Sequence, residues 1–491
     1  MIKDIIVQLS VFLGLTALVG LITWLHCRKA ARSTDTTREY FLANSGLNWM
    51  FIAGSITLTN INTDTLVGWN GNQMLLITWW ELSAVVGLIL LAKVFVPIYY
   101  RYNCTTVTEL LERRYQNRHI RATVATIFLL GNLFLFLPAM LYTSSLIIKS
   151  MFGLPATIAG IDTIIVLSAF TAAVGAAYAI IGGLRAVAIS DTYSGIIVLG
   201  LAMLVVVLAL NAVHWSFAGI PAERLTLIGD SHSLLPWPTL FTGMIYTQLY
   251  YWSTNQTITQ RALAAPSIRE AQKGVYASAA IRLFIIPPMI AIPGVCAYKL
   301  FGNLGDQAYG RLVGSVLPHW LMGAFAAAMF AAVMTSYNAT LNSSAALYVC
   351  DLHEKYAARK GSLAKLSMGV SFGFALLSIV LVPLYEGAPS IIQRIQSWLG
   401  LFSMPILSAF ITGLLFRNVD ARAVIATIVF GSGLYAVFTF AWTPLHFLHL
   451  MFITVWACVG FALLLNRLVF GRQARLEVAR IGEILKAALA S

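Results

Sequence analysis

The sequence predicts an all-α polytopic membrane protein with about thirteen transmembrane helices. Hydrophobic residues make up 59% of the 491 positions and charged residues 10%, and the mean hydropathy is +0.80. Soluble domains are typically about 45–50% apolar and about 25% charged, so this composition excludes an ordinary soluble protein. Two of the apolar segments are interrupted by polar residues, which a lipid-facing helix cannot satisfy.

Window hydropathy places the spans in order along the chain, each near the roughly 20 residues needed to cross a bilayer except the seventh. The predicted spans are 5–26, 49–69, 77–99, 122–148, 161–181, 194–213, 240–252, 275–298, 320–346, 366–384, 395–416, 424–442 and 448–465. The first is too long for a signal peptide and its basic cluster follows the apolar run, so we expect a retained helix.

Basic residues predict the orientation. If the N-terminus lies outside, the Lys- and Arg-rich loops 101–118, 261–273, 355–365 and 467–475 all lie inside, while the basic-poor loop 216–238 lies outside. We therefore expect a multi-pass protein of the cell (inner) membrane with a cytoplasmic C-terminus. The net charge of +13 reflects these loops, and we expect no nucleic-acid partner.

The polar interruptions predict the internal architecture. The second span carries Asn60, Asn62 and Asp64 at its centre, and the seventh runs into the polar stretch 250–256. Broken segments five helices apart are typical of transporters built from two inverted five-helix repeats. We predict repeats at 49–213 and 240–416, an extra helix and cytoplasmic loop at 1–48, and an extracellular loop at 214–239. Two further helices and a cytoplasmic tail complete the chain at 417–491.

The tail is amphipathic after residue 467, with apolar residues at helical spacing between charged ones. This pattern predicts a short helix on the cytoplasmic surface of the membrane. A solvated helix packed on the inner loops is the alternative.

Four ionisable residues in or beside the spans are candidates for function, because intramembrane charge is costly: Asp64, Glu81, Asp191 and Arg282. Each has a structural alternative. Asp64 would cap the half-helix after the break, and Glu81 would anchor at the interface. Asp191, in the loop expected after the fifth span, would pair with Arg185, and Arg282 would snorkel to the inner interface.

Thr335 and Ser336, in the ninth span, are candidate ligands for a hard cation together with carbonyls freed by a broken helix. Alternatively, both hydroxyls only bond back to their own helix. Neither catalytic motifs nor metal-ligand spacings of Cys or His are present, so we expect no enzyme and no cofactor.

Several stretches, in order over residues 35–420, resemble the sodium/solute symporter family, in particular its bacterial sodium/sugar branch. They are Tyr40–Ala43, Leu58–Ile61, Gly182–Val187 with Asp191, Tyr250–Trp252 with Asn255–Gln256, Gln260–Ala265, Ala271–Gly274 and Leu341–Ser343. The resemblance implies the LeuT-type inverted-repeat fold.

The resemblance also implies functional residues. A sodium site would use the carbonyls of Leu58, Ile61 and Ala332 with the hydroxyls of Thr335 and Ser336, and Asp191 would lie on the ion-release route. The implied solute-binding residues are Asn60, Glu81, Gln248, Tyr251, Arg282 and Gln396.

Against the family's galactose-binding pattern, Thr65 replaces a glutamine, Gln248 an asparagine, Ala84 a serine and Arg282 a lysine. A site that hydrogen-bonds particular hydroxyls discriminates strongly, so these changes leave the solute open.

The resemblance thus implies a symporter that uses sodium as coupling ion to import a sugar or polyol. One alternative is another small solute, such as an amino acid, a carboxylate or an anion: Arg282 favours an acidic ligand, Glu81 a neutral one. A non-transporting sensor is the other alternative, but the tail after Arg467 is too short for a signalling domain.

Overall fold

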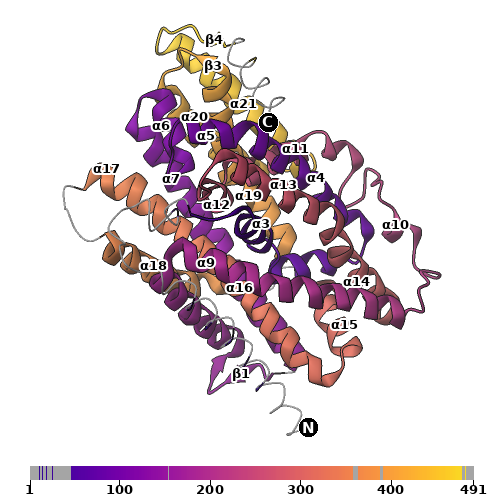
Figure 1. Ribbon diagram of the computed structural model, residues 1–491. Helices are drawn as coiled ribbons and strands as arrows, with labels where there is room; N and C mark the ends of the chain where they lie inside the picture. The colour runs from indigo at the N-terminus through magenta and orange to yellow at the C-terminus, as the bar shows by residue number, and fades with distance from the viewer. Residues whose placement is uncertain are drawn as a thin grey trace.

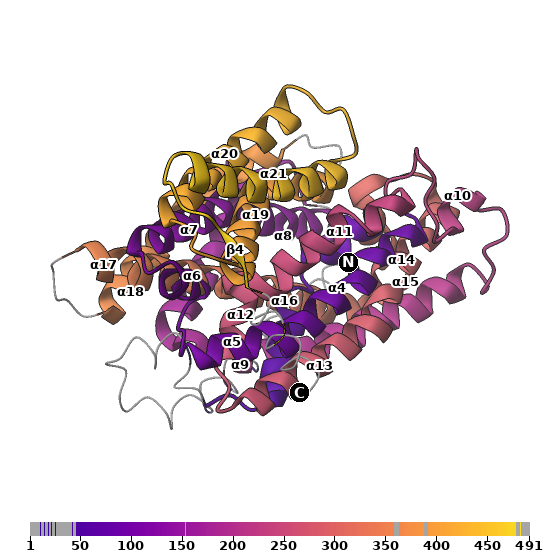
Figure 2. The ribbon, with the colours of Figure 1, turned by 90° about the horizontal axis from the view of Figure 1, so that it is seen from above.

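The computed structural model describes residues 46–152, 154–357, 363–386 and 391–477, with a few single positions between 10 and 42 and residue 482. Figure 1 shows a bundle of helices, and Figure 2 shows α20 (Ala421–Phe440) and α21 (Phe447–Leu468) side by side along one flank of it. The predicted first span at 5–26 and most of the predicted tail helix lie outside the described residues.

The second predicted span is a broken helix. It consists of α3 (Trp49–Leu58), an irregular stretch and the π-helical segment η2 (Asp64–Trp69). Asn48 begins α3 by accepting a hydrogen bond of 3.1 Å from the backbone N–H of Phe51. After the break, Asn62 Oδ1 accepts from the N–H of Thr65 at 3.0 Å. Asn62 therefore caps the second half, and the alternative that gave this role to Asp64 is wrong.

The seventh predicted span is also broken. It comprises α11 (Gly243–Leu249), the π-helical η7 (Tyr250–Thr254) and α12 (Gln256–Leu263). Asn255 interrupts the helix with an extended backbone (φ −76°, ψ 127°), and its side chain caps α12 by accepting from Thr257 N–H at 2.9 Å. Asn255 thus ends η7 and begins α12, because Asn readily leaves helical geometry and its side chain caps a helix N-terminus.

The remaining elements before α11 connect these parts. They are η3 (Leu75–Thr78), α4 (Trp79–Leu90), η4 (Leu91–Phe95), α5 (Val96–Arg101), α6 (Val107–Tyr115), α7 (Arg118–Gly131), η5 (Asn132–Phe136), α8 (Leu137–Phe152), β1 (Thr157–Ile158), β2 (Ile161–Asp162), α9 (Thr163–Ala212), α10 (Ala222–Leu225) and η6 (Trp237–Leu240). Strands β1 and β2 pair antiparallel, with Thr157 opposite Asp162.

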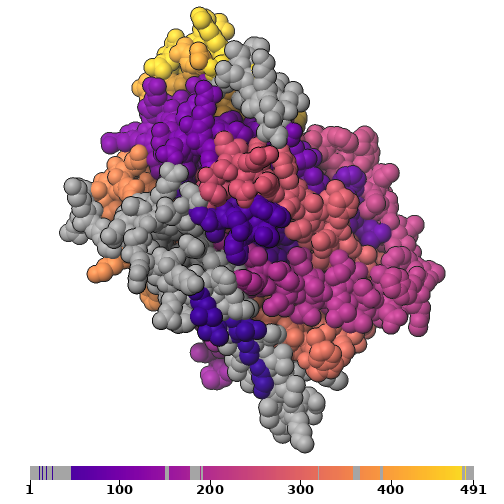
Figure 3. All heavy atoms as spheres, viewed as in Figure 1, coloured from indigo at the N-terminus to yellow at the C-terminus, as the bar shows by residue number. Residues whose placement is uncertain are grey.

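After α12 the chain is again almost entirely helical. The elements are α13 (Ile268–Phe284), α14 (Ile286–Phe301), η8 (Gly305–Gln307), α15 (Ala308–Val316), α16 (His319–Ala346), η9 (Leu347–His353), α17 (Glu354–Tyr356), α18 (Leu363–Leu381), η10 (Val382–Tyr385) and α19 (Ile391–Leu415), followed by β3 (Phe416–Arg417), α20, α21 and β4 (Arg475–Leu476). Figure 3 shows α3, in indigo, on one face between α13 in red and α9 in magenta.

Within the described residues, nine helical stretches are long and apolar enough to cross a membrane, and two shorter apolar helices accompany them. The predicted class, an all-α polytopic membrane protein, is confirmed. The count of about thirteen spans stays a prediction. The long stretches follow the predicted ranges closely; for example, Leu75–Arg101 matches 77–99 and Ile391–Leu415 matches 395–416.

The predicted loop between the fifth and sixth spans is wrong. The backbone is helical throughout α9, which runs for 50 residues and includes position 191. The connecting stretch contains no proline, and each glycine of its Gly-Gly pair costs a helix only about 1 kcal/mol, so helical hydrogen bonding continues. The Asp191 and Arg185 side chains lie outside the described part of the structure, so the roles predicted for Asp191 stay predictions.

The tail packs against the end of α19. Strand β4 pairs antiparallel with β3, which follows α19 directly. Glu477 then forms an ion pair of 2.6 Å with Arg417 and a longer one of 3.3 Å with Arg114. As far as residue 477, the tail is therefore held against strand β3 and helix α6.

Candidate functional site

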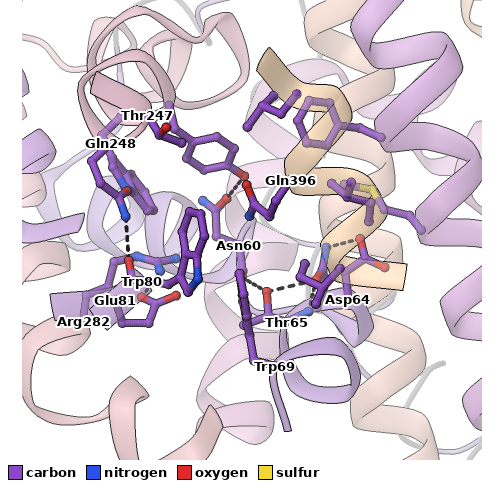
Figure 4. Close-up of a pocket in the computed structure, with 18 residues that line it drawn as sticks. Asn60, Asp64, Thr65, Trp69, Trp80, Glu81, Thr247, Gln248, Arg282 and Gln396 are labelled. Atoms are coloured by element: carbon purple, nitrogen blue, oxygen red, sulfur yellow. Dashed lines mark hydrogen bonds and ion pairs between the residues drawn. The ribbon is translucent and has the colours of Figure 1, made fainter. Parts of the chain in front are cut away.

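A cavity lies beside both broken helices, where α4, η5, α8, α13 and α19 also approach. All the residues predicted to bind solute line it: Asn60, Glu81, Gln248, Tyr251, Arg282 and Gln396. Figure 4 shows Glu81 and Arg282 at one side of the cavity and Asp64 at the other, with Asn60 and Thr65 between them.

Glu81 and Arg282 form a buried ion pair. The Arg282 guanidinium donates to Glu81 Oε2, although the two residues are 201 positions apart. The same guanidinium donates to the carbonyl of Thr57 at 3.2 Å and lies 4.2 Å from the ring centroid of Trp252. Both side chains are buried inside the protein: that of Arg282 is 1% exposed and that of Glu81 8%. Each charge is directed at the other, whereas a snorkelling Arg282 or an interface-anchored Glu81 would direct its charge to solvent.

Tyr251 and Asn60 connect the two broken helices. The Tyr251 hydroxyl donates to Asn60 Oδ1, and Asn60 Nδ2 donates to the carbonyl of Ile56 at 3.1 Å. The break in the first helix and the π-helical end of α11 are thus joined directly at the cavity. Movement of either half-helix would therefore break this hydrogen bond or move the other half-helix with it.

Gln248 is fully occupied by protein partners. Its amide N–H groups donate to the carbonyl of Trp80 and to Ser83 Oγ, each at 2.8 Å, and its oxygen accepts from Trp252 Nε1 at 2.8 Å. Gln248 therefore fixes two tryptophans of the cavity wall.

Aromatic residues that the sequence analysis did not single out form much of the wall. Trp69 and Trp80 stack with ring centroids 5.1 Å apart, and Trp252 and Phe136 also line the cavity. The only sequence signal was the unusual number of tryptophans beside polar residues in broken segments.

Gln396 has an oxygen without a hydrogen-bond donor among the described residues, whereas the Thr65 hydroxyl already donates a hydrogen bond. Gln396 Oε1 is buried and has no hydrogen-bond partner among the described residues. The Thr65 hydroxyl already donates to the carbonyl of Asn60 at 2.6 Å. An unpartnered buried oxygen costs free energy, which a donor on a bound molecule would recover.

Asp64 lines the cavity at the side away from Arg282 (Figure 4). The hydroxyl of Thr143 donates to Asp64 Oδ1, and Asn62 Nδ2 lies 3.4 Å from Oδ2. Thr63 is hydrogen-bonded to Thr143 at 2.9 Å, so a hydroxyl chain leads to the carboxylate.

One of the predicted cation ligands, Ser336, contacts the first break. Ser336 Oγ donates to the carbonyl of Thr59 at 2.7 Å, which brings α16 against the irregular stretch that also contains Leu58 and Ile61. Thr335 Oγ1 donates to the carbonyl of Ala332 at 2.8 Å, and Ser336 Oγ is also 3.2 Å from it. The Thr59 carbonyl was not among the predicted ligands, because residue type does not distinguish one backbone carbonyl from its neighbours.

Comparison with known proteins identifies the family. The model of the sodium:solute symporter family matches residues 40–431. A protein of Escherichia coli (strain K12) named "Uncharacterized symporter YidK" is 33% identical over 487 residues, covering 93% of this chain and 83% of that protein. The chain belongs to the sodium:solute symporter family.

Other symporters are similar over most of their length. The sodium/glucose cotransporter of Vibrio parahaemolyticus is 28% identical, covering 84% of this chain and 81% of that protein. The sodium/myo-inositol cotransporter 2 of Mus musculus is 28% identical, covering 87% and 68%. The members named here are transporters rather than enzymes, and the symporter described here is a multi-pass membrane protein that shares their family.

The structure of a Na⁺-coupled sialic acid symporter, in a substrate-bound outward-open state, superposes on this symporter with a TM-score of 0.79 at 18% sequence identity. The match covers 94% of this chain and 98% of that chain. At this identity the likeness shows the fold alone, and it confirms the predicted LeuT-type architecture with its two broken helices.

Proposed function

We propose that this symporter imports a neutral sugar or polyol together with sodium, by alternating access across the cell (inner) membrane, with the N-terminus outside. The single observation that carries the proposal is the cavity between the two broken helices, lined by tryptophans, amides and a neutralised ion pair. Family membership supports sodium coupling. The glucose and myo-inositol cotransporters among the relatives support a polyhydroxylated solute.

The cavity suits such a solute chemically. Aromatic faces such as those of Trp69 and Trp80 cover apolar ring faces, while side-chain oxygens such as Gln396 Oε1 accept hydrogen bonds from hydroxyl groups. In the proposal Asn60, Glu81, Gln248, Tyr251, Arg282 and Gln396 form the solute site. Gln248 acts through the tryptophans that it holds, since its own amide has no remaining donor.

Sodium would bind where α16 meets the first break. We propose the carbonyls of Leu58, Ile61 and Ala332 and the hydroxyls of Thr335 and Ser336 as its ligands, because a hard cation prefers oxygen ligands. The contact between Ser336 and the Thr59 carbonyl supports this placement.

Coupling would follow from the shared broken helix. The same irregular stretch reaches the proposed sodium ligands on one side and Asn60 in the cavity on the other. If sodium and solute both bind best to one arrangement of this stretch, each raises the affinity for the other. One charge moved inward across a membrane potential of 100 mV supplies about 2.3 kcal/mol, and the sodium gradient adds to it.

An acidic solute is the second candidate, since Arg282 lies at the cavity and the structural relative named above transports sialic acid. The Glu81 partner argues against it. Arg282 already pairs with a carboxylate inside the protein, so a second carboxylate would have to displace Glu81 from it.

Uptake into proteoliposomes tests the proposal. Labelled glucose and myo-inositol should accumulate under an inward sodium gradient with a negative interior, and accumulation should vanish when potassium replaces sodium outside. A parallel thermal-shift panel of sugars, polyols, amino acids and carboxylates should show the largest sodium-dependent stabilisation for a neutral polyhydroxylated compound. Accumulation of an acidic solute alone would overturn the proposed class. Uptake that ignores every sodium gradient would overturn the mechanism.

A further inference from the structure

We infer that Asp64 is a specificity residue that makes the cavity reject anionic solutes; the inference rests on the proposed function and narrows its substrate class. The charged side chains of the cavity lining do not balance one another. The ionisable carboxylates and cations that line it are Asp64, Glu81 and Arg282. Glu81 and Arg282 neutralise one another as a buried pair. In the described part of the chain no Lys or Arg forms an ion pair with Asp64, which leaves one uncompensated negative charge.

Some donors and acceptors in the cavity wall are already hydrogen-bonded within the protein, and others remain for a ligand. Several donors in the wall are used within the protein: Gln248 Nε2 donates to Trp80 and Ser83, and the Tyr251 hydroxyl donates to Asn60. The Thr65 hydroxyl also donates, and Asn60 Nδ2 uses one of its two N–H groups on the carbonyl of Ile56. The Arg282 Nε–H has no partner in the described structure, but it is buried.

Acceptors for a ligand remain at the Asp64 side and at Gln396. Gln396 Oε1 has no partner in the described structure. Each oxygen of Asp64 receives one donor, and a carboxylate has about four acceptor positions. The remaining acceptor positions of Asp64 therefore suit hydrogen-bond donors on a solute, such as hydroxyl or ammonium groups.

The position of Asp64 brings it into contact with a bound solute. It lies at the opposite side of the cavity from Arg282 (Figure 4), so a solute spanning the cavity meets it. A carboxylate or phosphate there would face the like charge of Asp64, which no Lys or Arg among the described residues pairs with, and like charges suppress binding strongly. A hydroxyl would donate to Asp64, and an amino group would add an ionic attraction. Asp64 therefore selects neutral or cationic polyhydroxylated solutes over acidic ones.

Competition for sodium-dependent uptake of labelled myo-inositol tests this, with glucose, glucosamine and glucuronate as competitors that differ in charge. In the wild type, glucuronate should compete about tenfold or more weakly than glucose, and glucosamine at least as well as glucose. In Asp64→Asn, the gap between glucuronate and glucose should close to about threefold or less, and glucosamine should lose its advantage.

Two variants serve as controls. Asp64→Glu keeps the charge and should keep the wild-type ranking. Asp230→Asn removes the same charge from an exposed outer loop and should leave the ranking unchanged. The wild-type ranking is informative even if Asp64→Asn does not fold.

The outcomes separate the two claims. A wild-type protein that transports myo-inositol but binds glucuronate as tightly as glucose overturns the inference and leaves the proposed function intact. An Asp64→Asn ranking identical to the wild type also overturns it. If the wild type transports no neutral sugar or polyol with sodium, the proposed function itself fails.

Discussion

The hydroxyl of Ser336, on α16, donates a hydrogen bond of 2.7 Å to the carbonyl oxygen of Thr59 in the break of the first broken helix. The two residues are 277 positions apart. This contact joins a helix of the second predicted repeat to the irregular segment of the first, and it lies where we propose that sodium binds.

Replacing Ser336 by Ala is expected to raise the sodium concentration for half-maximal uptake about tenfold, because one oxygen ligand and the contact with Thr59 are lost. Solute affinity at saturating sodium should change much less. The measurement is initial uptake rate against sodium concentration in proteoliposomes. Ser378→Ala removes a hydroxyl on α18 that is hydrogen-bonded to the Tyr337 hydroxyl of α16 rather than to the break, and serves as control. Unchanged sodium activation in Ser336→Ala would remove this residue from the site.

Replacing Arg282 by Met is expected to lower the free energy of unfolding by about 3–5 kcal/mol, because Glu81 is left buried and unpaired. The double change Glu81→Gln with Arg282→Met should recover most of that stability without recovering uptake. Denaturant unfolding in mixed micelles gives the first quantity and liposome assays the second.

The matched control for this pair is Arg113→Gln. It breaks an ion pair with Glu109 whose arginine side chain is 45% exposed, so the loss should be about 1 kcal/mol or less. If Arg282→Met were no more destabilising than Arg113→Gln, the buried pair would not have the structural role assigned to it.

Tyr251→Phe removes the hydrogen bond between the two broken helices and leaves the ring in place. Since such a bond contributes about 0.5–1.5 kcal/mol, solute affinity should fall about three- to tenfold. Isothermal titration in saturating sodium measures the change. Tyr250→Phe is the control, because that neighbouring ring packs against Phe128 instead. Equal effects of the two substitutions would contradict a specific role for the Tyr251 hydroxyl.

The stability of the protein should depend on pH through Asp306, which lies in the short helix η8 before α15. Burial raises the pKa of Asp306 from the ordinary 3.8 to about 6, although the N–H of Ile391 donates to it at 3.0 Å. The folded state therefore binds a proton more tightly than the unfolded state. Its contribution to stability is fully present below about pH 4 and is lost as the pH rises to about 6.

Comparison of wild type with Asp306→Asn isolates this effect. Between pH 4 and pH 7, the unfolding free energy of the wild type should fall by about 3 kcal/mol relative to that of Asp306→Asn. Thermal unfolding at a series of pH values follows it. A difference that is independent of pH would show that Asp306 has an ordinary pKa.

Sequence reasoning anticipated the groups of the site better than their contacts. The solute residues were predicted to share one site, and the structure places all of them around one cavity. Their partners were not predictable: that Gln248 would bind Trp80 and Trp252, leaving no donor for solute, depends on the positions of helices far apart in sequence.

Local alternatives could not be decided from the chain. Asp64 and Asn62 are both favourable caps, and only the backbone geometry after the break shows that Asn62 caps the N–H of Thr65. The predicted loop after the fifth span failed for a related reason. A Gly-Gly pair is compatible with either a turn or a continuing helix, and the structure contains the helix.

By itself, the sequence determined the membrane class, most of the spans, the two broken helices and the residue types of the candidate site. These follow from hydrophobicity and from the cost of unsatisfied polar groups in lipid, both of which are local properties. Tertiary structure alone decided that Arg282 is neutralised by Glu81, that Asp64 lies at the opposite side of the cavity from Arg282 and that Ser336 donates to the Thr59 carbonyl. Those relationships depend on how segments about 200 or more residues apart pack together, which no local pattern encodes.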